Sequence, residues 1–152
     1  MRTVDDVLSE KGRELHVVAP DATVHEAVRI MAERNIGAVV VCSRGELLGI
    51  ISERDCVRRV MLQGRSAHET RVDQAMTSPV RSVGLRDSID RCMQLMTDKR
   101  VRHLPVVEGK RVVGMLSVGD AVKAQISEQE DLIEGLESYI HGPSASVRPP
   151  AS

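Results

Sequence analysis

The chain repeats itself at a spacing of 65 residues. Residues 18–57 align with residues 83–122 without an insertion. Apolar positions that differ mostly exchange one apolar residue for another, as at Val24 and Ile89. An internal repeat constrains the architecture more than any single motif does. The identical pairs are Val18/Val83, Met31/Met96, Val41/Val106, Gly49/Gly114, Ser52/Ser117, Asp55/Asp120 and Val57/Val122.

The length of the chain sets how the two copies can fold. With 152 residues, the chain can form one compact domain or two small halves that share a core. A unit of about 60 residues is only marginally stable alone. We therefore expect the two copies to pack together.

Composition disfavours several classes of partner. The formal net charge is −1 and charged residues of both signs are interspersed, whereas a polyanion binder needs a basic face. Aromatic residues make up 1% of the chain, with Tyr139 the sole example, so a base-stacking platform for single strands is nearly excluded. A role in binding nucleic acid is therefore disfavoured.

Cysteine usage and hydropathy predict a cytoplasmic protein. Cys42, Cys56 and Cys92 form no CxxC pair, so we expect small buried side chains in a reducing compartment and no metal site. Residues 1–11 carry acids and lack the apolar segment of a signal peptide. No apolar run approaches the ~20 residues that a membrane span needs.

Capping patterns and apolar periodicity predict the elements of the first copy. Thr3 with Asp6 marks a capping box for a short helix, Val4–Lys11, which Gly12 ends. Thr23 with Glu26 marks another. An extended piece spans His16–Ala19, and the helix after Thr23 places Val24, Ala27, Val28 and Met31 on one face. Strands span Ala38–Cys42 and Glu46–Ile51, joined by a turn at Arg44-Gly45. A helix after Ser52 carries Cys56, Val57, Val60 and Met61 and ends at Gly64.

The second copy follows the same plan. We expect an extended piece at Val80–Val83, a helix at Ser88–Lys99, strands at His103–Val107 and Arg111–Leu116, and a final helix after Ser117. The predicted fold is α/β (α+β), with two β-α-β-β-α repeats packed through sheets or helices about a pseudo-twofold axis. A short N-terminal helix and a C-terminal amphipathic helix flank the repeats.

The sequence divides into five segments. Residues 1–64 hold the first repeat with its N-terminal helix, residues 65–74 form a polar linker, and residues 75–126 hold the second repeat. Residues 127–142 are expected to be a helix. An apolar stripe along it must cover the chain's own domain or contact a partner. The stripe comprises Ile126, Ile133, Leu136 and Ile140, and is widened by Leu132 and Tyr139. The Pro/Ser-rich residues 143–152 are expected to be disordered.

The repeated Gly-x-x-Ser-x-x-Asp motif lies where each copy passes from a strand into a helix. Ser and Asp at this spacing form a capping box, which is the plain structural explanation. The same geometry offers free N–H groups for a phosphate, and a carboxylate that could accept hydrogen bonds from ribose hydroxyls. The preceding glycine would let a base approach the backbone. Both interpretations stay open on the motif alone.

A second group of residues enters the first strand of copy two. Residues 100–105 read Arg-Val-Arg-His-Leu-Pro, whereas the matching residues 35–40 are uncharged. Charges at such a position are commonly solvated surface, but the mouths of strands in α/β layers are also where ligands bind.

Together these residues resemble a pair of cystathionine β-synthase (CBS) domains, or Bateman module. The doubled Gly-x-x-Ser-x-x-Asp signature and residues 101–107, Val-Arg-His-Leu-Pro-Val-Val, carry the resemblance, which covers residues 1 to about 126. It implies paired β-α-β-β-α repeats, a dimer of two pairs, and two adenosine-ligand clefts per chain. The ligand it implies is an adenine nucleotide, AMP first, with NAD(H) or ATP as other candidates.

The resemblance assigns residues to each cleft. Asp55 and Asp120 would hold ribose, and Ser52, Arg54, Arg102 and His103 would hold phosphate, which favours a phosphorylated ligand over S-adenosylmethionine. Cleft two lacks the Arg54 and Arg-His equivalents, so we expect it to bind weakly or to take a neutral adenosine end. Cleft one comprises Ile50, Ser52, Arg54, Asp55, Arg81, Val101, Arg102 and His103, and cleft two comprises His16, Ile36, Gly37, Ala38, Met115, Ser117 and Asp120.

Three functions compete with a stand-alone nucleotide sensor that signals to a protein partner. An enzyme is disfavoured, because no histidine stands beside a plausible nucleophile or at metal-ligand spacing and Ser52 has no identifiable base. A nucleic-acid binder is disfavoured by composition. A ligand-independent dimerisation module, in which the motif is only a cap, stays open.

Overall fold

A computed structural model describes residues 1–141, with side chains as far as Ser138. The first half of the chain forms three strands, with helical segments before, between and after them. Its elements are α1 (Val4–Lys11), β1 (Val17–Val18), α2 (Val24–Arg34), β2 (Ala38–Ser43), β3 (Glu46–Ser52), α3 (Glu53–Cys56) and the π-helix η1 (Val57–Met61).

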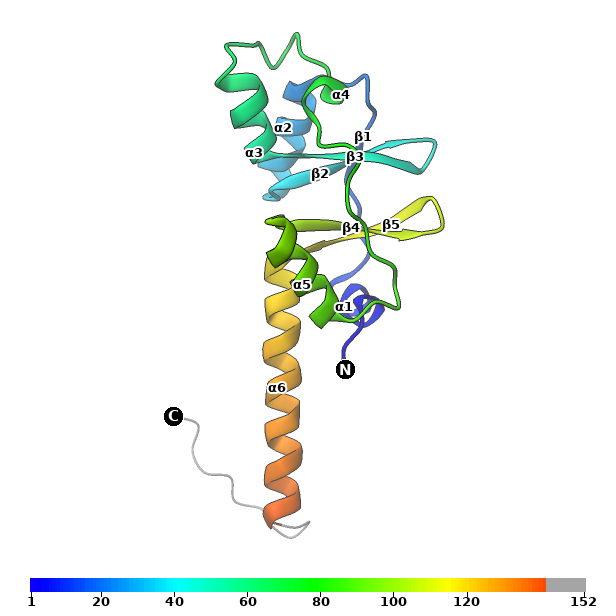
Figure 1. Cartoon of the computed structure of the whole chain (residues 1–152), viewed down its shortest axis with the longest axis vertical. Coiled ribbons are helices and arrows are strands. Elements are labelled where there is room, and N and C mark those ends of the chain that lie inside the picture. Colours follow the sequence, from blue (N-terminus) through cyan, green and yellow to red (C-terminus); the bar gives the residue numbers. More distant parts are fainter. Residues whose placement is uncertain (142–152) are drawn as a thin grey trace.

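The second half repeats this order. The extended piece expected at Val80–Val83 is reduced to a single parallel bridge between Val83 and Val106. The elements are α4 (Val72–Ala75), α5 (Ile89–Lys99), β4 (His103–Glu108), β5 (Arg111–Ser117) and α6 (Val118–His141). The predicted α+β repeats with flanking helices are confirmed (Figure 1).

A single five-stranded sheet joins the two repeats, in the order β1-β2-β3-β5-β4. The hairpins β2–β3 and β4–β5 are antiparallel, and Ala38 pairs with Ser52 just as His103 pairs with Ser117. Between the repeats, β3 and β5 pair at Glu46 and Arg111 alone, beside the hairpin turns. The two halves therefore meet at their turns and diverge toward the ends of the strands where the Ser-x-x-Asp motifs lie.

Each repeat's hydrophobic core is completed by the segment that precedes the other repeat. Val4, Val7 and Leu8 of α1 are buried among the residues of α5, β4 and β5. Val72 and Ala75 of α4 are buried among those of α2, β2 and β3. In Figure 1, α1 accordingly lies beside α5, and α4 lies beside α2. The packing of α1 and of α4 thus crosses the boundary between the two sequence repeats.

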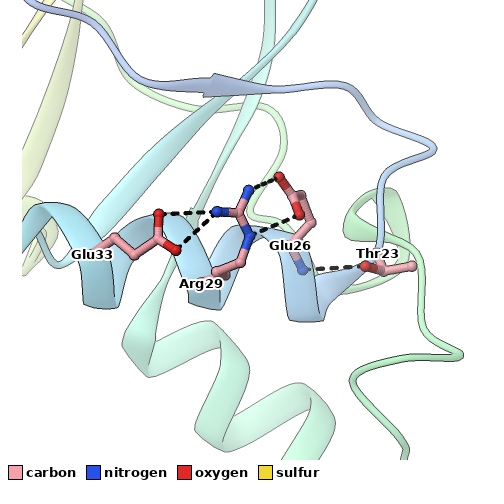
Figure 2. A network of polar contacts seen from close by, with 4 residues as sticks. All are labelled: Thr23, Glu26, Arg29 and Glu33. Carbon is pink, nitrogen blue, oxygen red and sulfur yellow. Dashed lines mark hydrogen bonds and ion pairs between the residues drawn. The ribbon is translucent and has the colours of Figure 1, made fainter.

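The predicted caps explain where the helices begin. In α1, Thr3 Oγ1 accepts from the N–H of Asp6, Asp6 Oδ2 accepts from the N–H of Thr3, and Gly12 ends the helix with φ 90°. In α2, Thr23 accepts from the N–H of Glu26, but the Glu26 carboxylate accepts from Arg29 instead of completing the box (Figure 2). Arg29 also pairs with Glu33, so this polar face of α2 is an i,i+3 and i,i+4 ion-pair network.

Three apolar residues on the predicted helices of the first repeat are exposed. Val28 lies on the outer side of α2, while Val24, Ala27 and Met31 are buried as expected. Val57 and Met61, at the two ends of the π-helix η1, are exposed as well, while Val60 between them is buried.

The C-terminal helix is continuous with the last helix of the second repeat. The sequence placed a boundary near residue 126, but α6 runs unbroken from Val118 to His141. It extends well beyond the rest of the molecule (Figure 1). Gly142 and the predicted disordered residues 143–152 lie outside the described residues.

Close packing at Gly49 gives a stability prediction. A Cβ added there would lie 2.6 Å from the carbonyl oxygen of Thr77, which is backbone and cannot rotate away. We expect Gly49→Ala to lower the free energy of unfolding by about 1–3 kcal/mol, the usual cost of overpacking. Gly114→Ala should cost less, because its contact at 2.8 Å is the flexible side chain of Leu8. Urea unfolding measures both.

Gly119→Ala is the matched control. Its Cβ would lie 3.7 Å from Ser117 Oγ, an ordinary contact, and alanine favours the helix. A Gly49→Ala variant as stable as Gly119→Ala would contradict the packing account.

Candidate functional site: a cleft between the repeats

Both Ser-x-x-Asp motifs form capping boxes at strand-to-helix junctions. Ser52 Oγ accepts from the N–H of Asp55 at 3.1 Å, and Asp55 Oδ2 accepts from the N–H of Ser52 at 2.9 Å. Ser117 and Asp120 repeat this geometry at 3.1 and 2.9 Å. The structural role of the motif is therefore present in both copies. Each aspartate retains its second oxygen for another partner.

The glycine of the motif serves packing and does not leave room for a base. At Gly49 the position of a side chain is filled by Thr77 and Met76, and at Gly114 it is filled by Leu8. These residues lie in or directly after α1 and α4, the helices that each complete the core of the opposite repeat. The interpretation of Gly49 and Gly114 as ligand-facing glycines is wrong.

A cavity of about 360 Å³ opens between the repeats beside Ser117 and Asp120. The start of β2 and the chain before β1 form one wall, and β5 with the start of α6 forms the other. All seven residues that the sequence assigned to cleft two line it. The complete lining is Lys11, Glu14, Leu15, His16, Asn35, Ile36, Gly37, Ala38, His103, Met115, Ser117 and Asp120.

The residues assigned to cleft one are placed differently. His103 lines the cavity of cleft two, because it pairs with Ser117 across β4 and β5. Asp55 lies with Ser52, and its Oδ1 accepts from the Thr77 hydroxyl at 3.0 Å. Ile50 pairs with Thr77 and is buried, Val101 is half-buried, and Arg54, Arg81 and Arg102 are exposed.

Lys11 is the main residue of the cleft that the sequence did not reveal. Its Nζ lies 2.7 Å from Asp120 Oδ2. The contact joins the end of α1 to the start of α6, and no repeat pairing or motif marks it. Glu14, Leu15 and Asn35 were also missed; Glu14 lies 3.4 Å from His16 Nε2. Residues next to predicted ones, such as Leu15 and Asn35, could have been found by extending the predicted segments.

A comparison with protein families decides what this arrangement is. The family model named CBS domain matches residues 4–62 and 72–127. The chain belongs to the CBS domain family. Its two repeats form a CBS pair.

Relatives of the CBS pair include a longer plant protein and a solved bacterial structure. CBS domain-containing protein CBSX3, mitochondrial, from Arabidopsis thaliana is 40% identical over 149 residues, which span 92% of this chain and 72% of the relative. A solved structure with CBS domains from Burkholderia ambifaria is 43% identical with a TM-score of 0.79, covering 84% of this chain and 96% of that chain.

A more distant solved structure shares the fold. It is the CBS domain pair of protein MJ0100 in complex with 5′-methylthioadenosine and S-adenosyl-L-methionine. It is 22% identical with a TM-score of 0.75, covering 84% of this chain and 98% of that chain.

Electrostatics in the cleft of the CBS pair centre on Asp120. Burial raises the pKa of this carboxyl, but hydrogen bonds from Lys11 and from the Ser117 backbone outweigh burial, so the pKa lies below its ordinary value. Asp120 is therefore an anion at neutral pH and a hydrogen-bond acceptor inside the cleft.

His103 is held neutral by burial. Burial lowers its pKa below 6.5; Asp120 and Glu53 oppose this shift, and Arg102 and Lys11 reinforce it. A neutral imidazole can both donate and accept a hydrogen bond in the cleft.

The surroundings of the thiols in the CBS pair make them unreactive. Cys56 and Cys92 are buried, and burial raises the pKa of each of these thiols to about 11. Burial also raises the pKa of the half-buried Cys42 thiol.

Within residues 1–141, no group of three or more metal-ligating side chains comes together. No helix in that range is long and apolar enough to cross a membrane.

The lowered pKa of His103 predicts a pH dependence of stability. The unfolded chain binds the proton at about pH 6.5, but the folded chain resists it, so the free energy of unfolding should fall as the pH drops from 7.5 to 5.5. His103→Gln should remove part of that loss. Urea unfolding at both pH values measures it, with His68→Gln, an exposed histidine outside the cleft, as control. An equal loss in wild type and His103→Gln would contradict the assignment.

Proposed function

We propose that the chain is a regulatory module that binds an adenine nucleotide in the cleft between its CBS repeats and signals occupancy to a protein partner. The observation that carries this proposal is the cavity itself. It brings the Ser117–Asp120 pair of one repeat opposite Gly37 and Ala38 of the other. A ligand in this cleft contacts both repeats, so its binding can bias how they pack.

Each wall of the cleft suits a different part of a nucleotide. Asp120 accepts hydrogen bonds from the ribose hydroxyls, and Ser117 with the first N–H groups of α6 suits a phosphate. The base lies against residues 36–38, where little space is taken by side chains. A side chain at Gly37 would begin 3.4 Å from both His103 and Glu53, so a larger residue would narrow the cleft.

The choice of ligand class draws on the family. The solved pair with 5′-methylthioadenosine and S-adenosyl-L-methionine shows that one distant member binds adenosine compounds. AMP is the ligand we propose first, with NAD(H) and ATP as alternatives that share the adenosine unit. No metal is part of the proposal.

Cleft one is proposed as a second and less accessible site. Ile50, Ser52 and Asp55 would face residues 101–103, with Arg54 and Arg81 at the rim. The Thr77 hydroxyl already donates to Asp55 Oδ1, so ribose would have to replace it. Occupancy of this site is therefore expected to follow that of cleft two.

Stand-alone CBS pairs are generally regulatory rather than catalytic, and we propose no enzymatic activity for this chain. Ser117 is engaged as a helix cap, and the neighbouring His103 is held neutral by burial. The net charge of −1 is consistent with a small-molecule ligand and gives no support to nucleic-acid binding.

We propose a homodimer formed through α6. Arg2 and Gln125 hold one side of this helix to the domain, through Ser127 and Asp90. The apolar stripe is on the free side: Ile126, Ile133 and Leu136 are 52%, 54% and 53% exposed. Their seven- and three-residue spacing is that of helices that pair with one another. The stripe also favours the alternative function, a dimerisation module that needs no ligand.

Ligand-induced thermal shift separates the two functions. Saturating AMP should raise the Tm by several degrees through mass action, since a ligand at 100 times its Kd adds about 2.7 kcal/mol. Asp120→Asn should abolish most of the shift, because the amide keeps a cap but loses the charge that strengthens the ribose hydrogen bonds. Asp55→Asn should reduce the shift less.

The control for this experiment is Asp21→Asn, an exposed loop residue outside the cleft, which should keep the full shift. The sensor proposal fails if AMP, ATP and NAD(H) all leave the wild-type Tm unchanged, and the dimerisation module then takes its place.

Light scattering after size exclusion tests the dimer. Ile133→Glu should raise the dimer dissociation constant at least about tenfold, because the new charge would have to be buried in an apolar interface. Val28→Glu, an exposed valine on α2, is the matched control and should leave the dimer intact. If the wild-type chain is a monomer even at about millimolar concentration, pairing through α6 is refuted.

A further inference from the structure

Helices α1 and α4 occupy equivalent places in the two repeats. Thr3, the cap of α1, forms a bridge with Ser88, and Arg71, before α4, forms one with Thr23. Thr23 and Ser88 are themselves equivalent helix caps, 65 residues apart. Leu8 fills the space at Gly114 and Met76 fills the space at Gly49. Helices α1 and α4 thus make equivalent contacts, each with the repeat that it helps to close.

The pair is unequal in length. Helix α1 has eight residues and α4 has four. The last turn of α1 has no equivalent in α4, and that extra turn carries Lys11. As a result the two motif aspartates have different third partners: Asp120 pairs with the Lys11 ammonium at 2.7 Å, and Asp55 pairs with the neutral Thr77 hydroxyl at 3.0 Å.

We propose that Lys11 makes the Asp120 cleft selective for adenosine ligands that carry an anionic group. Without ligand, the Lys11 ammonium pairs with Asp120. When the ribose hydroxyls bind Asp120, the ammonium moves to pair with the ligand's phosphate. Lys11 is a specificity-determining residue in this account. The inference rests on the proposed function and adds to it the charge of the ligand.

The geometry of the Lys11 side chain allows it to change its ion-pair partner in this way. Lys11 is at the C-terminal end of α1, its side chain is 35% exposed, and both it and Asp120 line the cavity. A lysine ammonium is a point charge on a flexible stem, so it can move between acceptors within one cavity. His16 and His103 line the same cavity and add hydrogen-bonding nitrogens there.

Charge then decides which ligand binds well. Lys11 shares Asp120 Oδ2 with the Ser117 N–H, so a neutral adenosine whose two ribose hydroxyls use both carboxylate oxygens displaces the ammonium and leaves it without an anion. AMP replaces the lost carboxylate with its phosphate, and charge-assisted hydrogen bonds are about twice as strong as neutral ones. This reverses the ranking drawn from the sequence, in which cleft two was the neutral site and cleft one the phosphate site.

Calorimetric titration of the full chain with adenosine and with AMP tests the proposal. The wild type should bind AMP at least about tenfold more tightly than adenosine, the usual effect of one charge-assisted bond. Lys11→Met keeps the aliphatic stem and removes the charge. It should weaken AMP binding about tenfold and strengthen adenosine binding severalfold, so that the preference nearly disappears.

Matched variants make the result specific. Lys11→Arg should keep the preference for AMP, and Lys110→Met, in the turn between β4 and β5, should change neither affinity. An unchanged Tm for Lys11→Met confirms that the fold is intact. A Lys11→Met variant that retains the wild-type preference, or loses both affinities equally, overturns the role of Lys11 while the proposed function stands. If the wild type binds neither compound at millimolar concentration, the proposed function fails and this inference fails with it.

Discussion

The exchange of leading segments between the two repeats is the constraint on which the rest of the structure depends. A repeat of about 60 residues cannot bury enough apolar surface alone. Here α1 completes the core of the second repeat and α4 completes that of the first, with Leu8 and Met76 seated against the motif glycines. Neither repeat has a closed core without the other half of the chain. The sheet adds little to this union, since β3 and β5 pair only at Glu46 and Arg111.

The exchange also creates the cleft. Because α1 packs on the second repeat while β1 belongs to the first, the chain between them must cross the interface, and Glu14 to His16 form a wall of the cavity as they do so. The strands diverge from the turns where β3 and β5 meet, which leaves space at the opposite ends, beside Ser117 and Asp120. The cavity between the repeats is thus a product of how the cores are closed. The residues that line this cavity come from both halves of the chain.

Local chemistry could be predicted from the sequence, and tertiary exchange could not. The bounds of α1 follow from Thr3, Asp6 and Gly12, and the structure confirms them. The members of cleft two came from the repeat and the family resemblance, and the structure gathers them around one cavity. The position of Lys11 depends on α1 crossing to the other repeat, which no local pattern encodes.

The broken symmetry of the repeats carries the functional account. Identical Ser-x-x-Asp pairs receive different third partners, because the helix before one repeat is a turn longer than the helix before the other. The central claim is that the Asp120 cleft holds an adenine nucleotide. A crystal structure of the chain grown with AMP tests it most directly. The account predicts ribose hydroxyls within hydrogen-bonding distance of Asp120 and the base against Gly37 and Ala38. A nucleotide bound only beside Asp55, or outside both clefts, would contradict it.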